Sequence, residues 1–351
     1  MPRLAPFAFA LLLPLLLVLA GCESTGNRPS LVKPHALMPG DTIAFVAPAK
    51  WRPEEALQAA ENALAERGYK VKRYPQIESR YGYLAGSDEE RAAALMDAFR
   101  DPEIDAILPV TGGYGLTRIL DRLDWEVIRA NPKIVMGYSD LTALHIALEQ
   151  RAGVVGFHSP FPTWMYAGKD GPAAFTEDSL WRALEAARYP ADEQGYLIDP
   201  AGLSRPVETL VPGVARGRLT GGNLSLITAL MGTPYEIDTR GALLFIEEVG
   251  EDPYRVDRMF STLAMSGKLA QANGIVIGVF RGCEPDEPEI SLTVEQLFEE
   301  YLGGLGVPVV VNFPVGHVGE NATLPVGILA ELDADSGTIR LLENPVELGV
   351  R

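Results

Sequence analysis

The sequence has little cysteine, little histidine and few positive charges, and each shortage argues against a class of protein. It has two cysteines and four histidines in 351 residues, with no cysteine pair and no two histidines at helical ligand spacing, so we expect no metal site. We expect no other cofactor either. Thirty Lys and Arg against 47 Asp and Glu give a formal net charge of −17. This balance argues against a nucleic-acid partner, which would require a basic face.

The composition is that of a folded protein. Hydrophobic residues make up 47% of the chain and charged residues 22%. A chain of this kind can bury a core and is not disordered. Its length suits one large domain or two ordinary ones.

The N-terminus has the pattern of a targeting segment. An apolar run over residues 7–19 is too short for a membrane span and is typical of a signal peptide. It ends in LAGC, which resembles the lipobox of bacterial lipoproteins and implies a lipid on Cys22. The resemblance implies a signal peptide over residues 1–21, a tether over residues 22–36 and a lipid anchor in the cell envelope, on the periplasmic side in a Gram-negative cell. Cys283 would then have no disulfide partner.

From residue 37 onward, short apolar runs alternate with helical patterns. The order β-α-β-α-β predicts a parallel sheet covered by helices, a flavodoxin- or Rossmann-like domain over residues 37–160. Residues 161–212 are rich in Pro, Gly, Trp and Tyr around one expected helix over residues 179–187. We interpret them as a bridge or a substrate-facing loop. Strands and turns follow, so residues 213–351 predict a mixed α/β, strand-rich domain.

Within residues 107–148 the chain passes twice from a strand into a helix. The second passage has the letters GYSD. Ligands bind at the carboxyl ends of strands in an open α/β sheet, and a serine on such a tight turn is held out of the sheet. We therefore predict that Ser139 is the nucleophile of a hydrolase. A serine at a helix start can also be only an N-cap.

The first passage has the letters TGGYG and is expected to shape the oxyanion or substrate-binding site. Its members are Gly112, Gly113 and Tyr114. The backbone N–H groups of Asp140 and Gly113 are the expected oxyanion donors. A glycine-rich turn can also bind phosphate, but this one lacks the Gly-Lys-Ser/Thr ending of a P-loop and the full dinucleotide fingerprint.

A serine nucleophile needs a base, which is usually histidine. His317 lies between glycines on a turn after a strand, which suits a general base. His158 ends a strand that follows the GYSD turn, so it could face the cleft as a substrate contact. His145 is expected to pack in the core, and His35 precedes the first core strand.

The base in turn needs a carboxylate to orient it. Glu247 ends the apolar strand ALLFI, and Glu248 follows it. Neighbouring residues on a strand face opposite sides, so one of the two should face the cleft. The pattern alone does not choose between them, and a solvated acidic turn is the other interpretation.

A set of motifs, in order over residues 37–342, resembles the LD-carboxypeptidase family of muramoyl-tetrapeptide and microcin-immunity carboxypeptidases. The motifs are PGDTI, VAPA, GYLAGSDEER, GGYG, GYSD, GGNL, IEEVGE and GH. The resemblance implies a serine carboxypeptidase that hydrolyses the L,D-peptide bond before a C-terminal D-amino acid in murein tetrapeptides, through an acyl-enzyme. It assigns Ser139 as nucleophile, Glu247 as orienting carboxylate and His317 as base. It also implies two domains that divide this triad between them, and often a homodimer.

The sequence departs from the family near the expected cleft. Lys50 stands in place of an expected serine, and FHSP around His158 stands in place of His-Gly-Pro, so substrate preference is open. The arginine that would hold a terminal carboxylate is expected among Arg118, Arg216 and Arg218. Two alternatives remain: a serine amidase acting on peptidyl-nucleotide, microcin-like or other amides, and an inactive lipoprotein that binds the cell wall.

Overall fold

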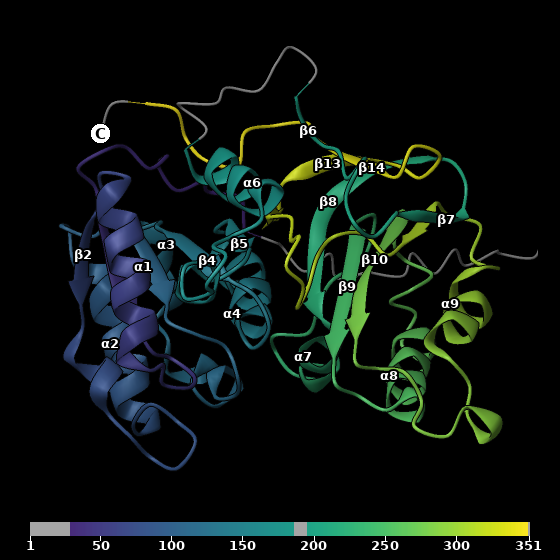
Figure 1. Ribbon diagram of the computed structural model, residues 1–351, viewed down its shortest axis with the longest axis horizontal. Coiled ribbons are helices and arrows are strands. Elements are labelled where there is room, and N and C mark those ends of the chain that lie inside the picture. Colours follow the sequence, from purple (N-terminus) through teal and green to yellow (C-terminus); the bar gives the residue numbers. More distant parts are fainter. Residues whose placement is uncertain (1–28, 186–194, 350–351) are drawn as a thin grey trace, which may run out of the picture.

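The computed structural model describes residues 29–185 and 195–349, which form two β-sheets lying side by side (Figure 1). This arrangement confirms the predicted α/β architecture, with an N-terminal parallel sheet and a C-terminal mixed, strand-rich part. Within the described residues, no helix is both long and apolar enough to cross a membrane. The predicted signal peptide and Cys22 lie outside the described residues.

The first sheet has six strands in the order β12-β5-β4-β3-β1-β2. Strands β1 to β5 pair in parallel, and β12 pairs antiparallel with β5. The central strands β3 and β4 are buried along their whole length, as strands of a parallel sheet with two covered faces usually are. The bounds are β1 (Thr42–Val46), β2 (Lys70–Arg73), β3 (Ala106–Pro109), β4 (Ile134–Gly137), β5 (Gly156–His158) and β12 (Leu324–Val326).

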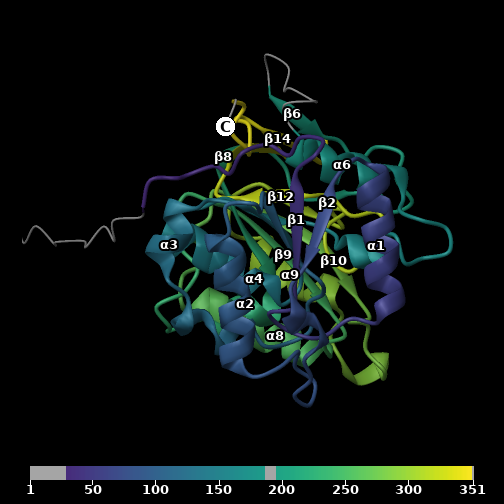
Figure 2. The ribbon, with the colours of Figure 1, turned by 90° about the vertical axis from the view of Figure 1, so that its left-hand side faces the viewer.

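Helices cover both faces of this sheet. In Figure 2, α1 lies on one side of β1 and β2, and α2 and α3 lie on the other. Helix α2 begins at a capping box in which Ser87 and Glu90 exchange side-chain and backbone hydrogen bonds. The helices are α1 (Glu54–Glu66), α2 (Asp88–Arg100), α3 (Trp125–Ala130), α4 (Leu141–Ala147), α5 (Pro162–Met165) and α6 (Ala174–Leu184), with a π-helical turn at Leu148–Ala152 and 3₁₀ turns at Pro75–Glu78, Leu116–Arg118 and Leu120–Arg122.

The second sheet has eight strands in the order β6-β14-β13-β8-β9-β10-β11-β7. Strands β8 to β11 are parallel, and the outer strands are antiparallel. The strands are β6 (Tyr196–Ile198), β7 (Glu208–Val211), β8 (Val214–Asn223), β9 (Leu243–Val249), β10 (Gly274–Arg281), β11 (Val309–Val311), β13 (Leu329–Asp333) and β14 (Thr338–Leu341). The helices are α7 (Leu224–Ala229), α8 (Pro253–Met265) and α9 (Val294–Leu302), with a 3₁₀ turn at Pro288–Ile290.

Two segments of the chain join sheets in a way that the sequence did not predict. Residues 161–212, expected to be a bridge, also supply the edge strands β6 and β7 of the second sheet. These strands are short and partly exposed, so they lack the apolar alternation that would have predicted them. The predicted second domain also supplies β12 to the first sheet, where Leu324 lies opposite His158. Such a pairing between distant parts of the chain leaves no local signal.

The parallel strands of both sheets deliver the candidate residues to neighbouring positions. Ser139 follows β4, whereas Glu247 lies near the end of β9 and beside Asn223, the last residue of β8. The two sheets are linked here, because the Asn223 N–H donates to Thr142 Oγ1 of α4 at 2.9 Å. The carboxyl ends of the strands, where α/β folds place their ligands, therefore meet between the domains.

Candidate active site

Ser139 lies on the turn between β4 and α4, with a φ of 63°. Residues other than glycine rarely occupy this left-handed region. Gly137, just before it, has a φ of +146°, and a Cβ at that position would lie 2.4 Å from the Phe161 ring. Close packing therefore holds the turn in the strained, sharp form that is typical of a nucleophile elbow.

Gly112 lies directly against this elbow. A Cβ on Gly112 would lie 3.0 Å from Ser139 Cβ, 3.2 Å from Ser139 Oγ and 3.3 Å from the backbone nitrogen of Asp140. Because Gly112 has no side chain, the space in front of the serine hydroxyl and the Asp140 N–H stays open. An oxyanion needs such a space.

The rest of the glycine-rich turn lies nearer the surface. Gly113 has a φ of +105°, and a Cβ there would lie 3.1 Å from Lys50 Cβ. Tyr114 is 45% exposed, and its ring centroid lies 5.9 Å from that of Tyr83. Lys50 therefore lies beside the turn that would form the oxyanion site, while Tyr114 extends along the surface.

The Asp140 side chain joins the two turns. Its Oδ2 accepts a hydrogen bond from the Leu116 N–H at 2.9 Å, and its buried Oδ1 has no partner among the described residues. Burial raises the pKa of Asp140 to about 6, although the Leu116 hydrogen bond and the positive charge of Arg91 act in the opposite direction. The carboxyl group thus fixes the glycine-rich turn against the elbow, while the Asp140 backbone nitrogen lies beside the space that a side chain on Gly112 would fill.

His317 and Glu247 form a hydrogen-bonded pair. His317 Nδ1 lies 2.8 Å from Glu247 Oε2, and the Glu247 side chain is fully buried. Gly316 permits this approach, because a Cβ there would lie 2.9 Å from the same carboxylate oxygen. The ring of Tyr138, the neighbour of Ser139, lies edge-on to the His317 imidazole at a centroid distance of 4.7 Å. The structure therefore brings the elbow and the His–Glu pair together from different domains.

Glu248 has different partners. Its carboxylate accepts hydrogen bonds from Ser225 Oγ, the Ser225 N–H, Asn223 Nδ2 and a backbone N–H of its own strand. Burial is the main cause of its raised pKa. The strand alternation thus places Glu247 beside the histidine and Glu248 in a buried network at the start of α7.

The other central histidines lie in the core. His145 is buried with its Nε2 2.8 Å from the Gly137 carbonyl oxygen, and burial lowers its pKa to about 4. His158 is also fully buried, edge-on to Phe245 at 5.1 Å and close to Tyr138. Burial, together with two neighbouring histidines, holds the pKa of His158 well below its usual value. His158 thus lies in the core and is not among the residues that line the cavities described next, so its predicted contact with a substrate stays a prediction.

Two adjoining cavities open beside His317. One, of about 630 Å³, is lined by Tyr138 and Trp164. The other, of about 520 Å³, is lined by Arg205. Arg281 lines both cavities, as does His317. Their volumes lie within the usual range for small-molecule sites.

The three arginines that the sequence offered for a terminal carboxylate are engaged elsewhere. Their partners are Asp88 for Arg118, Glu331 for Arg216, and Glu343 and the Gly327 carbonyl for Arg218. Because two of its nitrogens are bound to Asp88, Arg118 is not placed as a substrate contact. Sequence reasoning missed Arg281, whose Nη1 donates to the His317 carbonyl at 3.1 Å. The signal available in the sequence was only its position directly after the apolar run IVIGVF.

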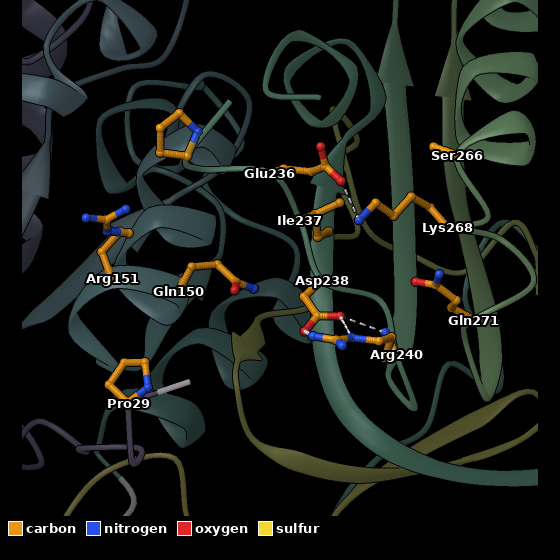
Figure 3. A pocket seen from close by; sticks show the side chains of 11 residues that line it. Pro29, Gln150, Arg151, Glu236, Ile237, Asp238, Arg240, Ser266, Lys268 and Gln271 are labelled. Carbon is orange, nitrogen blue, oxygen red and sulfur yellow. Dashed lines mark hydrogen bonds and ion pairs between the residues drawn. The ribbon is translucent and has the colours of Figure 1, made fainter. Parts of the chain in front are cut away.

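A larger cavity of about 750 Å³, shown in Figure 3, contains none of the candidate residues. It lies beside Pro29, at the start of the described chain. Four of its five charged side chains form ion pairs with each other, since Lys268 pairs with Glu236 at 2.7 Å and Arg240 with Asp238 at 2.8 Å. We therefore place the candidate site at the cavities beside His317.

Comparison with known proteins identifies the family. The LD-carboxypeptidase N-terminal domain matches residues 43–159, and the LD-carboxypeptidase C-terminal domain matches residues 216–332. The chain belongs to the LD-carboxypeptidase family. It is therefore a hydrolase of a family of serine carboxypeptidases with peptidoglycan-related members.

The similar proteins include named murein enzymes. A probable murein peptide carboxypeptidase of Bacillus subtilis is 42% identical over 306 residues, which cover 87% of this chain and 93% of the relative. The murein tetrapeptide carboxypeptidase of Pseudomonas aeruginosa is 30% identical over 306 residues, 84% of this chain and 93% of the relative. Each match extends over most of this chain and most of the relative.

Solved structures agree with this fold. Muramoyltetrapeptide carboxypeptidase from Oxalobacter formigenes superposes with a TM-score of 0.73 at 30% identity, over 86% of this chain and 97% of that one. The microcin C7 self-immunity protein MccF, in complex with glutamyl sulfamoyl guanosine, superposes with a TM-score of 0.80 over 90% and 99% of the two chains. At 24% identity, the second likeness shows the fold alone.

Proposed function

We propose that the protein is a serine LD-carboxypeptidase that removes the C-terminal D-amino acid from murein tetrapeptides. The observation that carries the proposal is that the elbow meets the His317–Glu247 pair, through the contact of Tyr138 with His317, beside two peptide-sized cavities. The names of the Bacillus and Pseudomonas relatives support the choice of substrate. The geometry itself supports acyl transfer through a serine nucleophile.

In the proposed reaction, His317 takes the proton of Ser139 while the serine oxygen attacks the carbonyl carbon of the L,D-peptide bond. Glu247 holds the imidazole in the required tautomer and stabilises its protonated form. The N–H groups of Asp140 and Gly113 receive the oxyanion. His317 then gives its proton to the leaving amine, and water that attacks the acyl-enzyme releases the shortened peptide and restores Ser139.

The test is mass spectrometry of a disaccharide-tetrapeptide incubated with the wild-type protein or with the Ser139→Ala variant. We expect the wild type to release one terminal D-alanine and the variant to release none. Cleavage by both proteins at similar rates would reject Ser139 as the nucleophile. No cleavage by either would reject the murein substrate, and the next substrates would be peptidyl-nucleotide and other amides.

We also propose that Cys22 carries a lipid that anchors the protein in the cell envelope. The LAGC letters after an apolar run support this proposal. The Cys22→Ser variant should leave the membrane fraction, whereas wild type stays in it. Equal partition of both forms would reject the anchor.

The family resemblance further suggests a homodimer. Sedimentation velocity of the soluble protein, over a range of concentrations, tests this proposal directly. A single monomeric species at all concentrations would reject it.

A further inference from the structure

We propose that Arg281 determines exopeptidase specificity by binding the C-terminal carboxylate of the substrate. This inference rests on the proposed function and deepens it. It assigns a residue to a task that the Ser139, His317 and Glu247 groups cannot perform. These three groups act on the peptide bond, and they do not distinguish a chain end from the middle of a chain.

The position of Arg281 is set by the parallel sheet. It is the last residue of β10, which pairs with β9, the strand that carries Glu247. Its Nη1 donates to the backbone carbonyl of His317 at 3.1 Å, and the side chain lines both cavities beside that histidine. This bond to Nη1 locates the guanidinium group at the edge of both cavities, and an arginine has further N–H donors on its other nitrogens.

The chemistry of the reaction fixes where the substrate carboxylate must lie. His317 must protonate the leaving amine, and the carboxylate of the released amino acid is only one carbon atom away from that amine. A group that binds the carboxylate must therefore lie immediately beside His317. An arginine is suited to this task, because its planar group can form two parallel hydrogen bonds with a carboxylate.

Other arginines near the site fit the task less well. Among the arginines of residues 29–185 and 195–349, Arg281 is the one that lines both cavities. Arg52 lies over the Trp164 ring at 3.6 Å and donates to the Thr163 carbonyl. Arg205 lines only the smaller cavity. Arg281 also makes no ion pair with a described carboxylate, unlike Arg118 and the other arginines that the sequence suggested.

The experiment compares a tetrapeptide with the same peptide carrying a C-terminal amide, using wild type, Arg281→Ala and Arg281→Lys. We expect wild type to prefer the free acid, and the Ala variant to raise KM for the acid by about 10–100-fold, the loss expected for a charge-assisted pair. The amide should be cleaved about equally by wild type and the Ala variant. The Lys variant should recover part of the preference, because it keeps the charge without the planar fork.

A murein peptide can carry a second carboxylate on its diaminopimelate side chain, so the assay also includes a peptide with lysine at that position. If Arg281 binds the terminal carboxylate, the Ala variant raises KM by the same factor for the diaminopimelate peptide and for the lysine peptide. A loss confined to the diaminopimelate peptide would overturn the proposal. So would an equal loss on acid and amide, since that would indicate a displaced His317 turn.

Arg240→Ala is the matched control, because Arg240 is exposed, pairs with Asp238 and lies in the cavity of Figure 3. It should cleave all the peptides as wild type does. Circular dichroism of each variant shows whether it is folded. Absence of cleavage by wild type itself would reject the proposed function, whereas cleavage by wild type with an unchanged acid preference in Arg281→Ala would reject this inference alone.

Discussion

Glu247 and Glu248 are adjacent on one strand but have different surroundings. This difference predicts that substituting them lowers catalytic activity to different extents. Glu247 offers a buried oxygen to His317 Nδ1 at 2.8 Å. In Glu247→Gln the amide can present an N–H there instead, which favours the wrong imidazole tautomer and removes the charge that stabilises the imidazolium. We expect kcat to fall by roughly 10³–10⁴-fold with little change in KM, as judged from other serine triads. Steady-state kinetics on the tetrapeptide measures both constants.

Glu248→Gln is the comparison, because Glu248 accepts three hydrogen bonds from residues at the start of α7 and one from its own strand, and none from His317. Its amide can accept only part of that set, so we expect a lower melting temperature and a smaller loss of kcat than in Glu247→Gln. A larger catalytic loss at Glu248 than at Glu247 would contradict the proposed roles of the two residues.

At the scale of the elements, the glycine-rich turn depends on a missing side chain. In Gly112→Ala the new methyl group would lie 3.0 Å from Ser139 Cβ and 3.3 Å from the Asp140 nitrogen, in the space assigned to the oxyanion. We expect kcat/KM to fall on the order of 10²–10³-fold, similar to the loss of one oxyanion donor. Gly304→Ala, whose Cβ meets nothing within 4 Å, is the matched control. If Gly112→Ala were as active as the control, the proposed role of Gly112 in the oxyanion site would be rejected.

The link between the two turns has its own pH dependence. The pKa of Asp140 is about 6 in the folded state against 3.8 ordinarily, so its contribution to stability is greatest below pH 3.8 and is lost as pH rises through 6. Asp140→Asn lacks this ionisation and can still accept the Leu116 hydrogen bond. Its unfolding free energy relative to wild type should rise by about 2 kcal/mol between pH 4 and pH 7.5. Urea unfolding at several pH values measures this difference. The prediction would be contradicted if the unfolding free energies of the variant and of wild type changed with pH in parallel.

The sequence predicted those elements whose signals are local. The alternation of apolar runs and helical patterns gave the parallel first sheet, and the letters GYSD gave the elbow at Ser139. Three features were not predictable, because each depends on residues distant in the chain. They are the edge strands of the second sheet, the burial of His158 and the ion pair of Arg118. Arg281 was missed for the same reason, since only the folded sheet brings it to His317.

At the scale of the whole molecule, the two domains are joined by a shared strand and by buried hydrogen bonds as well as by a contact surface. Strand β12 completes the first sheet, and β13 of the second sheet begins three residues after β12 ends. Hydrogen bonds cross the boundary as well, from the Asn223 N–H to Thr142 Oγ1 and from Thr220 Oγ1 to Glu149 Oε2 at 2.7 Å. Unfolding either domain would remove a strand or buried hydrogen bonds from the other.

We therefore expect the protein to unfold in a single transition despite having two domains. Calorimetry, tryptophan fluorescence and loss of peptidase activity should give one midpoint. Gly222→Ala tests the coupling, because its Cβ would lie 2.4 Å from Thr142 Oγ1 and its φ is +138°, so it strains the contact between the sheets. That variant should lower the common midpoint without dividing it. Two separate heat-capacity peaks in wild type would show that the shared strand does not couple the domains, and that the parts of the triad are assembled by docking of independently stable units.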